Sequence, residues 1–305
     1  MIELIFKVLL FLLVLGAFPL ATYIHACIRF YKIQPYLVYH PGLDLKSKSG
    51  EGPVPHQEVS YTTPDGIPIS AWYVPVENPV GVVLFCHGNA GNITQRTDAL
   101  ILFRQLGLSS FIFDYRGYGK SGGTPTEKGT YRDVEGAWDY LVNTLKVKPE
   151  ELIVFGRSLG GAVAAYIAEK HPPRALVIES SFTSTLDMAR RMFSRLLPIK
   201  LLMRFKYDTR KRLKTIHCPV MIIHSPEDET IPYAHGLALY QAANEPKVFL
   251  QIKGEHLHGF WYSRERYLDG WRIFLSQVIP NYVDYFIPGS EELAKEESPS
   301  EDSSV

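Results

Sequence analysis

The pattern of apolar and polar positions changes twice along this chain. Residues 8–28 carry no charged side chain and are bounded by Lys7 and Arg29. Residues 31–57 then collect prolines and glycines, which is typical of a linker. From residue 58 onward, short apolar runs alternate with longer amphipathic stretches. This pattern predicts an N-terminal apolar helix over 1–30, a linker, and a folded domain.

The apolar runs of the folded domain predict strands, and the stretches between them predict helices. The first two runs, 58–62 and 67–74, are separated by Pro64-Asp65-Gly66, which indicates an antiparallel hairpin. The run 80–86 is continuously apolar and the later runs are mostly apolar, as expected for parallel strands buried on both faces. These later strands are predicted at 80–86, 110–114, 152–155, 175–178, 220–224 and 248–252, and the helices at 94–106, 127–145, 159–170, 233–243 and 260–278. The alternation predicts an α/β fold whose mostly parallel sheet is covered on both faces.

The uncharged stretch 8–28 predicts a membrane anchor that stays on the protein. At about 1.5 Å per residue, its 21 residues span roughly 30 Å, the thickness of a bilayer core. A cleavable signal peptide is the alternative, but Ile24-His25-Ala26 is a poor cleavage site. Charges flank the stretch on both sides, so the sequence leaves open the side of the membrane on which the domain lies.

Composition narrows the class of protein. The chain has 305 residues, of which 46% are apolar and 21% charged, which excludes a disordered or collagen-like protein. Basic and acidic residues balance at 32 each, so no net charge points to nucleic acid. Three Cys residues, Cys27, Cys86 and Cys218, are too widely spaced for a disulfide framework or a metal knuckle. Nothing in the composition indicates an oligomeric state.

The strongest motif for chemistry is Gly156-Arg157-Ser158-Leu159-Gly160. It follows the predicted strand 152–155 and opens the predicted helix 159–170. A strand–turn–helix context of this kind is that of a nucleophile elbow, in which a tight turn lifts the serine oxygen clear of the sheet. The helix N-terminus behind the turn favours developing negative charge. We therefore predict that Ser158 is a nucleophile and not a structural turn serine.

A serine nucleophile needs a general base, and with this elbow the order along the chain is Ser, acid, His. His256 and His258 both follow the predicted strand 248–252. We predict that His256 is the base, because it lies nearer the strand end, where the sheet fixes position best. Asp228, on the loop after the strand 220–224, is predicted to orient it.

Other polar residues near the strand ends receive structural interpretations. Glu227 and Glu229, on either side of the predicted acid, are predicted to be solvated. Glu179 is an alternative acid, although a capping or loop-bonding role is favoured. His224 is predicted to be a structural residue at a strand end, and Arg116 to anchor its loop through hydrogen bonds.

Acyl transfer also needs backbone donors for an oxyanion. The N–H of Leu159 supplies one directly after the nucleophile. The second is predicted from His87-Gly88-Asn89-Ala90-Gly91-Asn92, the loop after the strand 80–86, with Asn89 as donor. A phosphate-binding loop is disfavoured there, because no Lys-Ser/Thr pair follows at the required spacing.

Four blocks of this sequence together resemble the α/β-hydrolase superfamily. They are the loop 87–92, the segment Asp114-Tyr115-Arg116-Gly117-Tyr118-Gly119-Lys120-Ser121, the motif 156–160, and the pair Asp228 and His256. The resemblance covers about 58–280 and is greatest to the membrane-anchored, serine aminopeptidase-like branch, which includes α/β-hydrolase domain-containing proteins. It implies an eight-stranded, mostly parallel sheet and a serine hydrolase that uses no cofactor.

In this fold a lid is expected between the strands 175–178 and 220–224, at about 181–217. From Arg190 to Lys214 the segment carries ten Lys or Arg and one acid. Its basic and apolar composition favours either contact with anionic lipid head groups or a solvated helical cap. Residues 281–305, rich in Ser and Glu, are predicted to form a disordered acidic tail.

These observations predict a membrane-anchored serine hydrolase that cleaves an ester or thioester bond of an acyl-ester or lipid-like small molecule. A serine peptidase is the alternative among enzymes. From another class, the alternative is a catalytically inactive hydrolase fold that serves as a membrane-tethered binding module. An intact set of Ser, His and Asp argues against that last alternative.

Overall fold

A computed structural model of the chain describes residues 2–42, 54–193, 196–256, 259–280 and 282. Its centre is an eight-stranded sheet in the order β10-β9-β8-β7-β4-β6-β3-β2. The strands are β2 (Gln57–Thr62), β3 (Pro68–Val74), β4 (Gly81–Cys86), β6 (Leu108–Phe113), β7 (Leu152–Arg157), β8 (Ala175–Glu179), β9 (Val220–His224) and β10 (Lys247–Gln251). The β2–β3 and β3–β6 pairs are antiparallel, and the other five are parallel. The predicted α/β class and mostly parallel sheet are confirmed.

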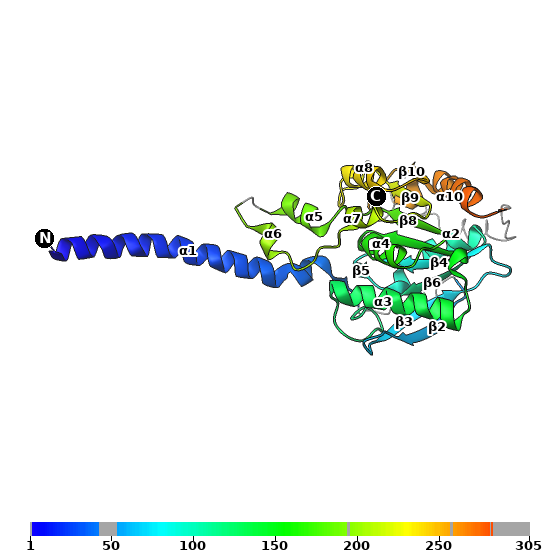
Figure 1. Cartoon of the computed structure of the whole chain (residues 1–305), viewed down its shortest axis with the longest axis horizontal. Helices are drawn as coiled ribbons and strands as arrows, with labels where there is room; N and C mark the ends of the chain where they lie inside the picture. Colours follow the sequence, from blue (N-terminus) through cyan, green and yellow to red (C-terminus); the bar gives the residue numbers. More distant parts are fainter. Residues whose placement is uncertain (1, 43–53, 194–195, 257–258, 281, 283–305) are drawn as a thin grey trace, which may run out of the picture.

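Helices cover both faces of this sheet (Figure 1), and β4 shows how the two faces are divided. Leu84 belongs to a buried apolar cluster that also holds Val163 of α4. The next residue, Phe85, belongs to a second cluster with Phe103 of α2. Neighbouring strand residues point to opposite faces, so a continuously apolar strand fills two cores. One face carries α3 (Glu127–Asp139), α4 (Leu159–Lys170) and α8 (Tyr233–Ala242), and the other carries α2 (Thr97–Gln105) and α10 (Arg264–Val278).

The N-terminal helix, α1, runs over Ile2–Val38 and extends away from the body of the molecule (Figure 1). In the part of the chain that the structure describes, no helix combines the length and the apolar character that crossing a bilayer requires. The membrane-spanning role predicted for 8–28 is therefore not confirmed. The side chains of 8–10 and 12–15 lie outside the described part.

The predicted boundary at residue 30, between an anchor and a linker, is wrong, because residues 31–42 do not form a linker. The helix continues through Pro35 to its end at Val38. The next residues form β1 (His40–Pro41), which pairs in parallel with β5 (Ala90–Gly91). The chain after α1 is therefore joined to the body by backbone hydrogen bonds and is not a free linker. Of the rest of the predicted linker, which extends to residue 57, residues 43–53 lie outside the described part of the chain, and β2 already begins at Gln57.

The predicted lid between β8 and β9 contains three short helices, α5 (Thr185–Met192), α6 (Ile199–Leu202) and α7 (Thr209–Leu213). The first part of this lid packs against the C-terminal half of α1. A small apolar cluster joins Phe30 of α1 to Ala189 and Ile199 of the lid. Except for Tyr282, the tail predicted over 281–305 lies outside the described residues. The remaining short elements are η1 (Ile93–Gln95), the π-helical turn Tyr140–Thr144, η3 (Pro149–Glu151) and α9 (Gly259–Tyr262).

Candidate active site

Three loops at the carboxyl edge of the sheet bring Ser158, Asp228 and His256 together. Ser158 lies between β7 and α4, Asp228 follows β9, and His256 follows β10. The Nδ1 atom of His256 lies 2.8 Å from Oδ2 of Asp228. On the other side of the ring, Nε2 of His256 lies 3.2 Å from Oγ of Ser158. The three side chains therefore form one continuous hydrogen-bonded chain, and all three residues are buried.

The turn that carries Ser158 has a backbone conformation that few residues other than glycine adopt. Ser158 has φ 56° and ψ −120°. Its N–H donates to the carbonyl of Glu179 at 2.9 Å, and its own carbonyl accepts from Ser181 Oγ at 2.7 Å. A Cβ at Gly160 would overlap the carbonyl of Cys86. Gly160 is thus required because β4 approaches it closely. The strained backbone of Ser158 is held by its hydrogen bonds to Glu179 and Ser181.

Both oxygens of the Asp228 carboxylate accept hydrogen bonds from neighbouring groups. Its Oδ1 accepts from the backbone N–H groups of Thr230 at 3.0 Å and Ile231 at 2.7 Å. Its Oδ2 accepts from His256 and also lies 3.5 Å from Nε2 of His224. Because His224 Nε2 bonds the carbonyl of Ile231 at 2.9 Å, this histidine supports the loop. The structural role predicted for His224 is confirmed.

Glu227 and Glu229 do more than the sequence predicted. Both side chains are exposed, as expected for solvated residues. However, Glu227 accepts a hydrogen bond of 2.8 Å from the N–H of Gly254, and Glu229 accepts one of 2.9 Å from the N–H of His256. The hydrogen bond from His256 also lowers the pKa of Glu229. The predicted solvent exposure of both residues is confirmed, and in addition they brace the loop that carries the histidine.

Glu179, the alternative acid, is used in a different way. Its Oε1 lies 2.8 Å from Nε of Arg157, and its Oε2 accepts from the hydroxyl of Tyr267 at 2.6 Å. All three residues are buried. The Arg157 guanidinium also lies 4.8 Å from the ring centre of Phe260. This network lies next to the turn at Ser158 and accounts for the arginine in the motif.

Arg116 anchors its loop, as the sequence predicted. Its Nε donates to Asp133 at 2.8 Å, and its two terminal nitrogens donate to Asp65 at 2.9 and 3.0 Å. The hydrogen bonds from Arg116 hold the pKa of Asp65 well below its ordinary value of 3.8. Arg132 also donates to Asp65, at 2.8 Å. The fork geometry of the guanidinium explains why arginine suits this position.

The two predicted oxyanion donors, Asn89 and Leu159, lie beside Ser158 in the wall of one pocket. Among the residues that the structure describes, no acceptor is paired with the backbone N–H of either residue. The Asn89 side chain donates to the carbonyl of Val38, the last residue of α1, at 3.1 Å. The Asn89 carbonyl accepts from the N–H of His40 at 3.0 Å. The end of α1 therefore fixes the loop that contains Asn89, whose backbone N–H is the second predicted oxyanion donor.

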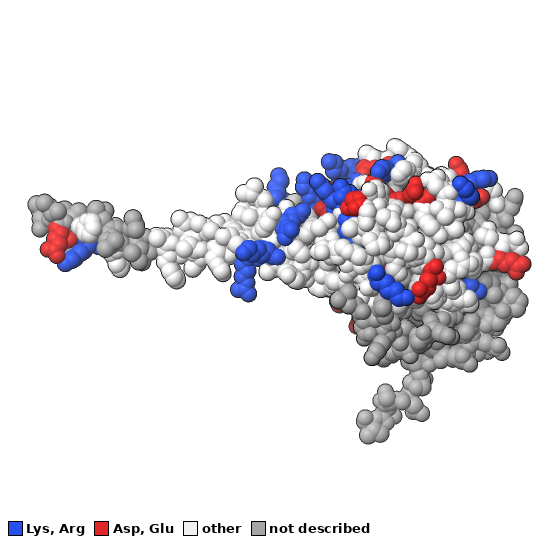
Figure 2. All heavy atoms as spheres, turned by 90° about the horizontal axis from the view of Figure 1, so that it is seen from below, with Lys and Arg blue, Asp and Glu red and all other residues white. Residues whose placement is uncertain are grey.

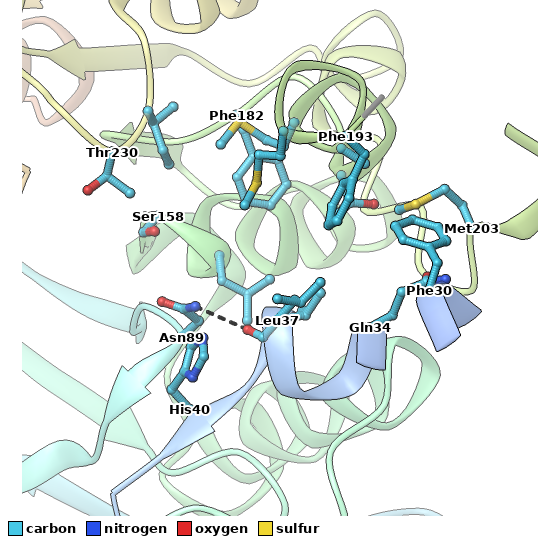
Figure 3. Close-up of a pocket in the computed structure, with 17 residues that line it drawn as sticks. Phe30, Gln34, Leu37, His40, Asn89, Ser158, Phe182, Phe193, Met203 and Thr230 are labelled. Carbon is cyan, nitrogen blue, oxygen red and sulfur yellow. Dashed lines mark hydrogen bonds between the residues drawn. The ribbon is translucent and has the colours of Figure 1, made fainter. Parts of the chain in front are cut away.

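The pocket beside Ser158 has a volume of about 340 Å³, within the range of small-molecule sites. Its walls come from three parts of the chain. The sheet edge gives Asn89, Ser158, Leu159, Thr230 and Ile231, the lid gives Phe182, Thr185, Met188, Ala189, Met192, Phe193 and Met203, and α1 with the residues after it gives Phe30, Gln34, Leu37, Val38 and His40 (Figure 3). The contribution of α1 to the pocket lining was not predicted from the sequence, because no motif marks these residues.

Within the described residues, no group of three or more His, Cys, Asp or Glu side chains is arranged to hold a metal ion. A hydroxyl, an imidazole and a carboxylate in hydrogen-bond contact can carry out nucleophilic attack on a carbonyl carbon. They lie beside two backbone N–H groups for which the described part of the chain provides no acceptor.

Comparison with known proteins gives consistent matches. A family model described as alpha/beta hydrolase fold matches residues 81–198. An uncharacterized protein of Mycobacterium tuberculosis is 34% identical over 231 residues, which are 72% of this chain and 79% of that protein. The alpha/beta hydrolase domain-containing protein WAV2 of Arabidopsis thaliana is 32% identical over 81% of this chain and 89% of its own length. A solved esterase of Pyrococcus furiosus superimposes with a TM-score of 0.65 at 19% identity, over 79% of this chain and 97% of the esterase.

Proposed function

Because this chain belongs to the α/β-hydrolase family, we propose that it is a serine hydrolase that cleaves ester or thioester bonds. The observation that carries the proposal is the hydrogen-bonded chain from Ser158 Oγ through His256 to Asp228. A hydroxyl is a weak nucleophile at its ordinary pKa, and an imidazole within reach is what activates it. The solved Pyrococcus furiosus protein is an esterase, which agrees with the proposal, although at 19% identity that likeness concerns the fold.

In the proposed reaction, Ser158 Oγ attacks the carbonyl carbon of the ester while its proton passes to Nε2 of His256. The Asp228 carboxylate holds the opposite ring nitrogen, Nδ1, and stabilises the charged imidazole. The carbonyl oxygen becomes an oxyanion and accepts hydrogen bonds from the N–H groups of Asn89 and Leu159.

The tetrahedral intermediate collapses when His256 returns the proton to the leaving alcohol or thiol and the bond to that group breaks. The acyl group is then bonded to Ser158. Water then attacks the acyl carbon while His256 takes its proton. The bond between that carbon and Ser158 Oγ breaks as His256 returns the proton to Oγ, and the acid product leaves. No cofactor enters any of these steps.

We also propose that the lid contacts an anionic lipid surface. Its exposed basic side chains are Arg190, Arg191, Lys200, Arg204, Lys206, Arg210, Lys211 and Lys214, and its exposed apolar side chains are Met192, Leu196 and Leu201. Basic side chains gather where α1 meets the body, and the middle of α1 is free of charge (Figure 2). Such a combination favours anionic membranes, at about 1 kcal/mol per basic residue near the surface.

Two experiments test these proposals. A fluorophosphonate probe should label the wild-type protein and leave a folded Ser158→Ala protein unlabelled; equal labelling of both would remove the proposed mechanism. For the lid, the protein should co-sediment with vesicles that contain phosphatidylserine more than with phosphatidylcholine vesicles. A double variant, Arg191→Glu with Lys200→Glu, should lose that preference, and its persistence would contradict the lid proposal.

A further inference from the structure

The C-terminal half of α1 presents one face to the pocket. Phe30, Gln34, Leu37 and Val38 all line it. Their spacing places them on one side of a helix. Tyr36, which lies between them in sequence, is 77% exposed and is absent from the lining. The helix therefore forms a wall of the cavity, in addition to any role that its N-terminal half has.

Gln34 attaches this wall to the lid. Its Nε2 donates to the carbonyl of Leu202 at 2.9 Å, and its Oε1 accepts from the N–H of Arg204 at 2.8 Å. The residue is only 3% exposed, so both ends of its amide are satisfied within the protein. A buried amide paired in this way fixes the two segments relative to each other. The hydrogen bonds of Gln34 thus fix the distance between α1 and the lid, and with it the width of the pocket between them.

Phe30 closes the pocket at the end far from the nucleophile. Figure 3 shows Ser158 and Asn89 at one end of the lining and Phe30 with Met203 at the other. Phe30 is 3% exposed and meets the ring of Phe193 edge to face, with 4.7 Å between the ring centres. Two packed rings and a methionine form a wall that an unbranched chain would meet end-on.

The lining selects an apolar occupant. Among the described lining residues none is Asp, Glu, Lys or Arg. Two of the polar lining residues are already engaged, since Gln34 bonds the lid backbone and Thr185 donates to the carbonyl of Phe205 at 2.6 Å. A polar or charged ligand group would lose its water there without gaining a partner.

We propose that the acyl part of the substrate is an unbranched fatty chain that lies between α1 and the lid, and that Phe30 sets its maximum length. The proposal rests on the proposed function, because it places the carbonyl carbon at Ser158. In this arrangement α1 is part of the substrate site, and the preferred substrates are esters of medium or long fatty acids.

The test is an acyl-length series on the full-length protein, with nitrophenyl esters from acetate through butyrate, octanoate and laurate to palmitate. Wild-type kcat/KM should rise from acetate to an optimum and then fall. Phe30→Ala should move the optimum to a longer chain, with the ratio of long to short substrates rising about tenfold or more. Ala189→Leu, which fills the same end from the lid, should move it to a shorter chain. Tyr36→Ala is the matched control on the same helix and should keep the wild-type profile.

The outcomes separate the two proposals. Turnover that persists in Ser158→Ala contradicts the proposed function itself. Turnover that depends on Ser158 but favours acetate, or a profile that neither Phe30→Ala nor Ala189→Leu shifts, contradicts only the fatty-chain proposal. If Phe30→Ala does not fold, Ala189→Leu decides the question, and an unchanged optimum in that variant overturns it.

Discussion

The carboxylate of Glu229 accepts a hydrogen bond of 2.9 Å from the backbone N–H of His256. Glu227 does the same for Gly254, two residues earlier, at 2.8 Å. The loop after β9 therefore holds the loop after β10 at two backbone positions, in addition to the contact between Asp228 and the imidazole. Together these contacts hold the loop that carries the imidazole beside Ser158.

Glu229 is accordingly expected to be a positioning residue. Replacing it by Ala should lower kcat by about ten- to a hundredfold with little change in KM, because a misplaced base slows the chemical step more than binding. Glu229→Gln keeps an acceptor oxygen and should restore most of the rate. Glu255→Ala, an exposed neighbour on the same loop, is the control. Equal effects of the Glu229→Ala and Glu255→Ala variants would show that the contact is unimportant.

Removal of the nucleophile should abolish ester hydrolysis. Ser158→Ala is expected to lose roughly 10⁴–10⁶ in turnover of a nitrophenyl ester. Circular dichroism checks that the variant is folded. Near wild-type turnover by a folded Ser158→Ala protein would place the nucleophile elsewhere.

The same position tests the backbone strain. Ser158→Ala and Ser158→Gly both remove the hydroxyl, but only glycine adopts φ 56° without a steric cost. We expect the glycine variant to be more stable than the alanine variant by about 1 kcal/mol, after the greater flexibility of its unfolded chain is allowed for. Urea denaturation of the two variants measures this difference. A glycine variant that is less stable than the alanine variant would indicate a relaxed turn.

The base and its acid should be separable by mutation. Asp228→Asn preserves shape but favours the wrong tautomer of His256, and should lower kcat about 10⁴-fold. His256→Ala should cost at least as much. His258, which lies outside the described residues, should tolerate Ala with a loss of only a few-fold. Collapse of activity in His258→Ala, with His256→Ala nearly unaffected, would exchange the two roles.

The buried ion pair of Arg157 and Glu179, next to the turn at Ser158, should raise the free energy of unfolding. Glu179→Gln leaves the buried guanidinium of Arg157 without its counter-charge, which typically costs about 3–5 kcal/mol. The exposed pair of Lys120 and Glu58, at 2.8 Å, gives the control, because Glu58→Gln should cost about 1 kcal/mol or less. The free energy of unfolding is measured in urea for each. Similar small losses of stability in the Glu179→Gln and Glu58→Gln variants would mean that the buried pair contributes little to the free energy of unfolding.

Asp65 should contribute to acid sensitivity. Its pKa is lowered in the folded protein by the hydrogen bonds from Arg116, so the folded state binds this proton less readily than the unfolded state. The resulting stabilisation, about 1 kcal/mol for a partly exposed pair, is complete above pH 5 and declines once the pH falls below 3.8. Wild type and Asp65→Asn should therefore differ in stability at pH 6, and the difference should shrink progressively as the pH falls below 3.8. A difference that stays constant with pH would contradict this assignment.

Much of the sheet and the tight turn at Ser158 could be predicted because the signals are local. The strand over Val220–His224 is a continuous apolar run, and the turn at Ser158 is marked by two glycines whose spacing the close packing requires. The bracing by Glu227 and Glu229 could not be predicted in the same way. An exposed carboxylate that accepts a backbone N–H from another loop leaves no pattern in its own segment.

The end of α1 is the clearest case of tertiary structure overriding local preference. A proline at position 35, followed by Pro41 and Gly42, favours a break in the helix. The helix nevertheless continues to Val38, where Asn89 bonds its last carbonyl, and Gln34 is satisfied by the lid. The partners of Gln34 lie 168 and 170 residues away along the chain, beyond the range of any sequence window.

That separation has a consequence for the protein during its synthesis. Gln34 leaves the ribosome long before Leu202, which lies 168 residues later, and at about 5–20 residues per second the interval is roughly 10–30 s. Over that time the helix has no lid to pack against, and Phe30 has no ring of Phe193 to meet. The nascent chain therefore carries an apolar helix face that is covered only when about two thirds of the protein has been made.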